Sequence, residues 1–312
     1  MKYTTLGRTG LKVSVVGLGC GGPSRIGQSQ KRSEADSLRV VREALGAGIN
    51  VIDSAEAYGT EAIVGKALRE VRREEVIVST KKSAWGDAAL SRAAITQSLE
   101  ASLKRLGTDY IDIYHVHAVL PKDYPLVRDE VVPCLLDLKR EGKIRFLGIT
   151  EMFHRDSGHA MLQLALEDDC WDVMMAGFNL LNQSARQRVF SRTLEKNIGT
   201  LIMFAVRRAL SRKERLLETL RDLEDRGLLD RGSADLSDPL GFLVHEGGAT
   251  NVTDAAYRYC RHEPGVDVVL SGTGDVVHLR ENIVSLLRED LPKRDRARLN
   301  TLFSRVDDIS GD

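Results

Sequence analysis

Short apolar runs alternate with longer amphipathic stretches along most of the chain. The runs are rich in Val and Ile, which is typical of parallel strands that are covered on both faces. Alternating strands and helices predict βα units, and eight such units close a (β/α)8 or TIM barrel, an α/β fold. The expected strands are Ser14–Leu18, Asn50–Asp53, Val76–Thr80, Ile111–His117, Arg145–Thr150, Asp172–Ala176, Thr200–Met203 and Val266–Leu270.

The segments between the strands place apolar side chains three or four residues apart, on one face of a helix. Ser33 is positioned to cap the first helix, and Gly46 and Gly48 are positioned to end it. The clearest apolar stripes are Leu38, Val41 and Leu45; Ile63, Ala67 and Val71; and Ile95, Leu99, Leu103 and Leu106.

Two segments lie outside the repeated unit. Residues 3–15 predict an N-terminal β-hairpin, with Gly7–Gly10 as its turn. Residues 205–249 form a long insertion after strand seven, with a charged helix expected near Ser211–Arg226, and insertions at this end of a barrel usually build or cover the site. Because no Pro-, Gly- or Ser-rich linker divides the chain, we expect residues 1–312 to form one domain.

The balance of positive and negative residues limits the kinds of molecule that the protein is expected to bind. Lys and Arg together number 45, and so do Asp and Glu, which argues against a nucleic-acid or anionic-membrane partner. The four cysteines are scattered, as in a reduced protein, and no window approaches the roughly 18 apolar residues of a membrane span. We therefore expect a cytoplasmic protein that acts on a small molecule, and we predict no oligomeric state.

A glycine-rich motif follows the first strand. Residues Gly17–Gly22 satisfy G-x-G-x-x-G, the fingerprint of a Rossmann dinucleotide site. The next residues, Pro23–Gln28, are unsuited to the first turns of a packed helix, and no acidic residue follows a second strand at the required distance. The motif instead indicates a glycine loop at the mouth of the first barrel strand.

Four ionisable residues follow or end consecutive strands. Asp53, Lys81 and His117 lie at the ends of strands two, three and four, and Tyr58 lies in the loop after strand two. Because the carboxyl ends of barrel strands meet around one mouth, these side chains are expected to converge.

The residue types fit one reaction. The ammonium group of Lys81 is expected to lower the pKa of Tyr58, and Asp53 would keep that ammonium charged. His117 can orient a substrate oxygen against the tyrosine. Because these groups supply a proton but no hydride, reduction of a carbonyl requires a nicotinamide.

Around these residues the chain resembles the aldo-keto reductase family. The resemblance implies NAD(P)H-dependent reduction of aldehydes or ketones, or the reverse oxidation of alcohols or sugar hemiacetals. It also implies a catalytic tetrad of Asp53, Tyr58, Lys81 and His117. The motifs that carry it are D-S-A-E-A-Y-G at 53–59, S-T-K at 79–81, S-L-K-R-L-G-T-D-Y-I-D-I-Y-H-V-H at 102–117, L-K-R-E-G-K-I-R-F-L-G-I-T at 138–150 and S-G-T-G-D-V-V-H-L-R-E-N at 271–282.

The same resemblance implies where the cofactor and substrate lie. Tyr58 and His117 would face the substrate, and Trp85 is expected to form a wall of the substrate pocket because it lies in the loop after strand three. Glu151 and Met175 replace the amide residues that usually contact the nicotinamide, and Phe204 is the candidate to stack on its ring. The full set of expected cofactor contacts is Gly19, Cys20, Gly21, Asp53, Thr150, Glu151, Met175, Phe204, Ser271, Gly272, Thr273, Gly274, Glu281 and Asn282.

The choice between NADP(H) and NAD(H) depends on cations near the adenosine 2′-position. Gly272–His278 contains no Lys or Arg, and Asp275 would repel a phosphate. Arg280, or Arg207 and Arg208 from the insertion, could supply the charge. The resemblance favours NADP(H), with NAD(H) as the alternative.

Two other functions compete with this hypothesis. His115 and His117 resemble the ligand pair of a metal-dependent hydrolase, but the later strands supply no further ligands, so we expect no metal site. We expect His115 to be a hydrogen-bonded core residue, and His154 and His159 to lie on the surface. The second alternative is an NADP(H)-binding sensor or regulatory subunit with little turnover.

Overall fold

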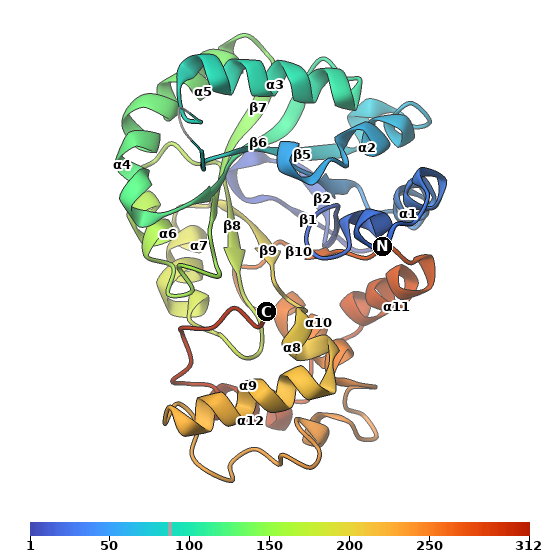
Figure 1. Ribbon diagram of the computed structural model, residues 1–312, viewed down its shortest axis with the longest axis vertical. Helices are drawn as coiled ribbons and strands as arrows, with labels where there is room; N and C mark the ends of the chain where they lie inside the picture. The colour runs from blue at the N-terminus through green and yellow to red at the C-terminus, as the bar shows by residue number, and fades with distance from the viewer. Residues whose placement is uncertain (87–88) are drawn as a thin grey trace.

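The computed structural model describes residues 1–86 and 89–312. Its centre is a closed barrel of parallel strands in the order β10-β3-β4-β5-β6-β7-β8-β9 (Figure 1). The predicted (β/α)8 barrel is therefore confirmed. Its strands are β3 Val16–Gly19, β4 Val51–Asp53, β5 Ile77–Ser83, β6 Ile111–Val119, β7 Ile144–Glu151, β8 Val173–Gly177, β9 Gly199–Met203 and β10 Val268–Ser271.

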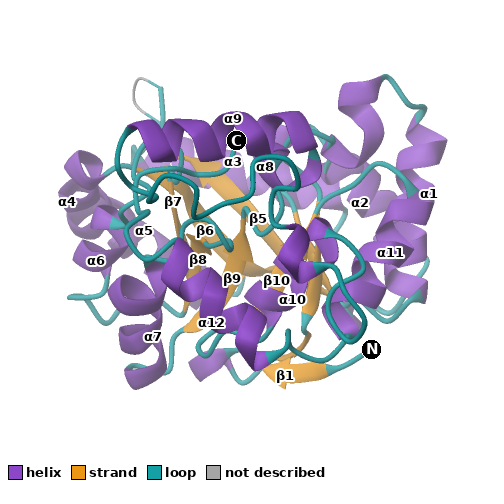
Figure 2. Cartoon of the chain, turned by 90° about the horizontal axis from the view of Figure 1, so that it is seen from below, coloured by secondary structure: helices purple, strands orange, loops and turns teal. Residues whose placement is uncertain are grey.

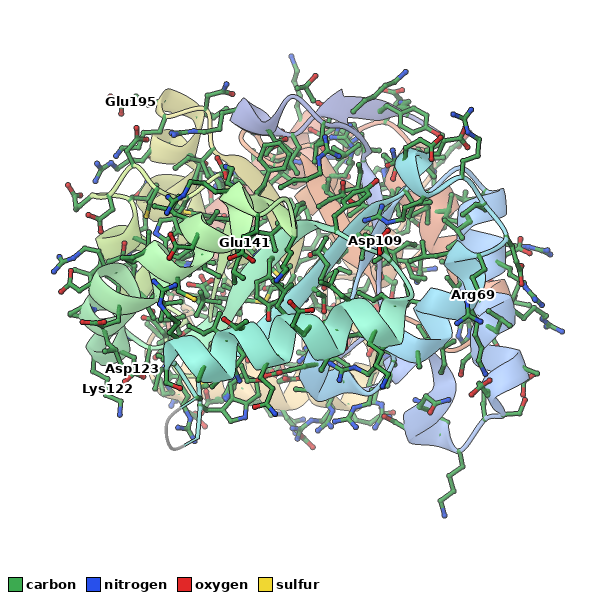
Figure 3. All side chains as sticks on the ribbon, turned by 90° about the horizontal axis from the view of Figure 1, so that it is seen from above. Arg69, Asp109, Lys122, Asp123, Glu141 and Glu195 are labelled. Atoms are coloured by element: carbon green, nitrogen blue, oxygen red, sulfur yellow. The ribbon has the colours of Figure 1, made fainter. Side chains whose placement is uncertain are left out.

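Helices surround the barrel, with loops at its two ends (Figure 2). Charged side chains such as Arg69, Lys122 and Glu195 lie on the outside of this layer (Figure 3). Within residues 1–86 and 89–312, no helix is long and apolar enough to cross a membrane. The helices that cover the barrel are α1 Glu34–Gly46, α2 Glu61–Leu68, α3 Arg92–Leu106, α4 Tyr124–Leu126, α5 Val132–Arg140, α6 Ala160–Ala165, α7 Ser191–Glu195, α10 Val252–Arg261, α11 Val276–Leu287 and α12 Lys293–Leu302.

The predicted hairpin is confirmed as β1, Tyr3–Thr5, paired antiparallel with β2, Lys12–Ser14. Buried apolar side chains of the hairpin join the cluster that fills the barrel interior. The hairpin thus closes the amino-terminal end of the barrel and leaves the carboxyl ends of the strands for a site. The cluster includes Leu6, Leu11, Val13, Val51, Ile77, Ile113, Val173, Met175, Leu201 and Val268.

The predicted start of α1 is confirmed, whereas the predicted end of α2 is wrong. Ser33 caps α1 in a capping box with Asp36, as its position indicated. The second stripe was extended too far, because α2 ends at Leu68 and Val71 is 37% exposed. Residues 69–70 form a turn after Leu68, so Val71 lies outside the helix.

The insertion after β9 contains α8, Arg208–Ser211, and α9, Lys213–Asp225. The predicted charged helix is therefore confirmed. Leu216, Leu220 and Leu223 form the buried face of α9, at helical spacing. Leu216 also borders the cavity at the barrel mouth, so the insertion forms one wall of the candidate site.

Candidate active site

A cavity of about 2000 Å³ opens at the carboxyl ends of the barrel strands. It runs from Tyr58, Trp85 and His117 to Glu281 and Asn282 on α11. Small-molecule sites usually enclose about 300–1,000 Å³. This cavity therefore has room for an extended ligand as well as a second, smaller molecule.

A buried ion pair lies beneath the cavity. Lys81 Nζ donates to Asp53 Oδ2 at 2.5 Å and to the carbonyl oxygen of Ser54 at 2.7 Å. Ser79 Oγ donates to the other carboxylate oxygen at 2.7 Å. Burial has the largest single effect and lowers the pKa of Lys81, but the charge of Asp53, the nearby Tyr58 and the hydrogen bond to Asp53 together outweigh burial and raise that pKa above its ordinary value. The ammonium group is therefore charged at neutral pH.

Tyr58 lies directly above this pair, in a 3₁₀ turn over Glu56–Tyr58. Its hydroxyl lies 3.2 Å from His117 Nε2, and Lys81 Nζ lies 5.1 Å from its ring centroid. A Cβ on Gly21 would come within 2.3 Å of the same ring, so the glycine loop predicted at the first strand makes room for it.

The pKa of Tyr58 differs from the sequence prediction. The charge of Lys81 lowers it as expected, but burial raises it more, so the pKa lies above the ordinary tyrosine value. The expected lowering was wrong in its net direction, because desolvation of the phenolate exceeds the attraction of the ammonium group. The hydroxyl therefore stays protonated at neutral pH.

His117 is neutral in the same environment. Burial, followed by the charge of Lys81, lowers its pKa well below the ordinary value. His115 is fully buried one layer deeper, as predicted, and pairs in register with Lys81. Neither of its ring nitrogens has a hydrogen-bond partner among the described residues, so the expected hydrogen bond is absent there.

Trp85 forms a wall of the cavity, as expected for a substrate pocket. Its ring centroid lies 5.0 Å from that of His117, at an interplanar angle of 58°. The indole is 47% exposed, so much of its surface faces the cavity and solvent. An apolar wall beside two polar groups is typical of a small-molecule site.

Glu151 makes a contact that the sequence did not predict. Its carboxylate oxygens lie 2.9 and 3.0 Å from Nδ1 of His159, and Oε1 accepts the Gly177 N–H at 2.8 Å. Burial raises the pKa of Glu151, and the His159 ring partly offsets that effect. The predicted surface position of His159 was wrong, because the imidazole is fully buried against this carboxylate.

This pairing engages the Glu151 carboxylate inside the protein. Its side chain is fully buried, although the residue borders the cavity. Phe153 stacks on the His159 ring at 5.4 Å and meets the Phe204 ring edge-on at 5.2 Å. An aromatic column therefore leads from the buried pair to the cavity wall.

The rest of that wall is apolar. Met175 and Met203 border the cavity beside Phe204. Phe204 has φ +66°, a left-handed conformation that is unusual for an aromatic residue and typical of functional loops. Phe204 borders the cavity, and its expected stacking on the nicotinamide ring stays a prediction.

The expected cofactor residues divide into two groups. Besides Asp53, those that border the cavity are Gly19, Gly21, Glu151, Met175, Phe204, Gly272, Thr273, Glu281 and Asn282. Cys20, Thr150, Ser271 and Gly274 lie behind this surface. Thr150 Oγ1 accepts the Ala118 N–H at 2.8 Å, and Ser271 Oγ accepts from Asn282 Nδ2 at 3.0 Å. They support the wall without lining it.

Carboxylates hold the arginines near α11. Arg32 pairs with Asp275 at 2.9 Å, and Arg280 pairs with Glu43 at 2.7 Å. Asp275 also caps α11, and its backbone hydrogen bond with Val277, followed by Arg32, lowers its pKa. The sequence did not indicate Arg32, because 243 positions separate it from its partner.

The loop before α11 has no room for a side chain at position 274, which is a glycine. A Cβ at this position would lie 2.4 Å from Gly27 Cα. The loop after β3 therefore occupies the space that a side chain at 274 would need.

A metal site at His115 and His117 would require further ligands close to the pair. Within residues 1–86 and 89–312, no group of three or more His, Cys, Asp or Glu residues is arranged to hold a metal ion. This is in keeping with the interpretation of His117 as a hydrogen-bonding partner of Tyr58.

Known proteins resemble this chain along most of its length. The sequence model of the aldo/keto reductase family matches residues 17–303. The aldo-keto reductase YhdN of Bacillus subtilis is 30% identical over 98% of this chain and 95% of its own length. The NADH-specific methylglyoxal reductase of Escherichia coli is 36% identical over 59% of this chain and 61% of its own.

A solved structure is similar across nearly the whole fold. The holo form of an aldo-keto reductase from Bacillus halodurans superposes with a TM-score of 0.72 and 26% identity. The match covers 97% of this chain and 96% of that protein.

Proposed function

Because this chain belongs to the aldo/keto reductase family, we propose that it reduces an aldehyde or ketone with a nicotinamide cofactor, with Tyr58 as the proton donor. The family establishes that it is an oxidoreductase of NAD(P)H-dependent carbonyl chemistry. The assignment of Tyr58 rests on one observation. Its hydroxyl meets His117 Nε2 at 3.2 Å above the buried pair of Lys81 and Asp53.

A substrate carbonyl oxygen would bind between Tyr58 and His117. Neutral His117 donates a hydrogen bond through Nε2 and orients the oxygen, while the tyrosine hydroxyl donates a second. When bound, the nicotinamide supplies the hydride that the protein's own groups lack. Trp85 would cover the rest of a small substrate with its indole face.

Proton transfer then depends on the buried ion pair of Lys81 and Asp53. As negative charge develops on the carbonyl oxygen, Tyr58 transfers its hydroxyl proton to it and becomes a phenolate. The charged Lys81 stabilises this phenolate, and Asp53 keeps Lys81 protonated inside the barrel. In the reverse direction the phenolate accepts a proton from an alcohol or a sugar hemiacetal.

The shape of the cavity fits an extended dinucleotide. Its volume of about 2000 Å³ accommodates such a ligand together with a substrate. Met175, Met203 and Phe204 would contact the nicotinamide, and Gly272 and Thr273 the phosphates. Glu281 and Asn282 would hold the adenosine end.

The purified protein should oxidise NADH or NADPH when given carbonyl substrates. A panel of small aldehydes, ketones and dicarbonyls, followed by absorbance at 340 nm, tests this activity. Cofactor binding without turnover on any member of the panel, and without alcohol oxidation, would favour the sensor alternative instead.

We also propose that NAD(H), rather than the NADP(H) favoured by the resemblance, is the preferred cofactor. A 2′-phosphate near Arg280 or Arg32 would compete with the carboxylates that pair with them. Asp275 is held in place by its capping bonds, so it remains as a repulsive charge. Fluorescence titration should give an affinity for NADH about tenfold higher than for NADPH, or about 1.4 kcal/mol.

Asp275→Asn provides the matched test of this preference. Asparagine also caps helices well, so the start of α11 is kept while the charge is removed. The variant should bind NADPH more tightly and leave NADH affinity unchanged. A wild-type protein that prefers NADPH would refute the proposal, as would a variant with an unchanged ratio of affinities.

A further inference from the structure

Arg207 is a cationic group at the cavity that the proposed chemistry does not use. It precedes α8 and borders the cavity together with Tyr58. Its guanidinium carbon lies over the Phe204 ring, 3.9 Å from the ring centroid, a cation–π contact. Its positive charge also acts on Tyr58, lowering the pKa that burial raises. Arg207 therefore lies near the reacting groups.

The hydrogen-bonding groups of Arg207 are only partly satisfied. Nη2 pairs with Asp312 Oδ2 at 2.9 Å, whereas Nε is buried and has no hydrogen-bond partner among the described residues. Nη1 lies 3.1 Å from the position that a Cβ on Gly22 would take, so the side chain reaches across to the glycine loop. The arginine is thus held in place with donors left for a ligand.

Hydrogen bonds to its backbone carbonyls hold the segment 309–312 beside the cavity. Asn182 Nδ2 donates to the Ile309 carbonyl at 2.9 Å, and Asn179 Nδ2 donates to that of Ser310 at 3.1 Å. The Ala209 N–H donates to the Gly311 carbonyl at 3.0 Å. This segment lies beside α8 in two views (Figures 1 and 2). These hydrogen bonds position the Asp312 carboxylate next to Arg207.

We propose that Arg207 binds an oxyanion of the bound ligand, a phosphate or carboxylate group, and that Asp312 is an internal competitor for it. The inference rests on the proposed function, because the ligand is one that occupies the same cavity. The oxyanion belongs either to the cofactor diphosphate or to an acidic substrate. Binding would exchange the Asp312 carboxylate for that group.

Charge and exposure make this exchange feasible. The Asp312 side chain is 36% exposed, and ion pairs with such access to water are weak. A phosphate or carboxylate that replaces Asp312 can accept hydrogen bonds from two guanidinium nitrogens at once, a bidentate contact that Asp312 does not make in this structure. The segment 309–312 then has one fewer bond to the insertion.

The first arm of the test measures cofactor binding without substrate. NADH affinity is titrated by fluorescence for the wild type, Asp312→Asn, Arg207→Gln and the double variant. If the cofactor supplies the oxyanion, Asp312→Asn should lower Kd about two- to fivefold, the range expected for a weak surface pair. The same substitution should have no effect in the Arg207→Gln background.

The second arm measures KM at saturating cofactor for 4-carboxybenzaldehyde and its uncharged analogue 4-nitrobenzaldehyde. If the substrate supplies the oxyanion, Asp312→Asn should lower KM about two- to fivefold for the carboxylate only. Arg207→Gln should remove this difference between the two aldehydes. Arg207→Lys, which keeps the charge, is the second variant if Arg207→Gln folds poorly.

Asp308→Asn is the matched control, because Asp308 pairs with Arg226, outside the cavity. An Asp312→Asn variant that changes neither arm would overturn the inference, as would an equal effect in the Arg207→Gln background. Failure of the proposed function is separate: a shift in NADH affinity without turnover on any carbonyl would refute the reaction but support the role of Arg207.

Discussion

Tyr58→Phe is expected to lose about 10²–10⁴-fold in kcat, the usual contribution of a positioned general acid. The substitution removes one oxygen atom and leaves a ring of the same shape against Gly21 and above Lys81. His117 remains neutral and still orients the carbonyl oxygen, but it has a low pKa and does not replace the lost acid. The measurement is steady-state oxidation of the cofactor with the best carbonyl substrate.

Cofactor affinity provides the control for this variant. Because the hydroxyl lies on the substrate side, toward His117, the Kd for NADH should stay within about twofold of the wild-type value. An unchanged kcat would remove Tyr58 from the chemistry. An equal loss of kcat and of cofactor affinity would indicate a damaged site instead.

Lys81→Met is expected to lower the free energy of unfolding by about 3–5 kcal/mol, the usual cost of breaking a buried ion pair from one side. Methionine has a similar length but leaves the Asp53 carboxylate buried without its cation. Ser79 Oγ remains as a donor, and one neutral hydrogen bond is insufficient compensation for a buried charge. Urea denaturation followed by circular dichroism measures the change.

The double variant Lys81→Met/Asp53→Asn separates the charge effect from packing. Removing the carboxylate charge as well should restore more than half of the lost stability, because a neutral amide is less costly to bury. Turnover should remain low in both variants, since the Tyr58 phenolate has lost its cation. A double variant as unstable as Lys81→Met would show that the ammonium group matters through packing alone.

Much of the site was predictable because the order of the strands along the chain fixes where each strand end lies in the barrel. Asp53, Lys81 and His117 end or lie near the ends of neighbouring strands, and the register pairs Asp53 with Ser79 and Ser83 with His117. Any chain that forms this barrel brings such residues to one mouth. The alternation of apolar and amphipathic segments was therefore sufficient to predict their convergence.

Burial of polar residues was predicted less well. His159 was expected on the surface because it follows a strand in a polar loop, but the loop folds back and pairs it with Glu151. The net pKa of Tyr58 was also missed, because the sequence shows the charges near a group but not how completely water is removed from it.

The sequence alone predicted the barrel, the hairpin and the convergence of Asp53, Tyr58, Lys81 and His117 at one mouth, because these follow from local periodicity and from the order of the strands. The tertiary structure decided which carboxylate each arginine meets: Asp275 for Arg32 and Asp312 for Arg207. Such pairs form between loops far apart in sequence, and loop paths depend on packing rather than on a repeating pattern. For the same reason only the fold showed that Arg207 borders the cavity together with Tyr58 and that Asp312 pairs with this arginine.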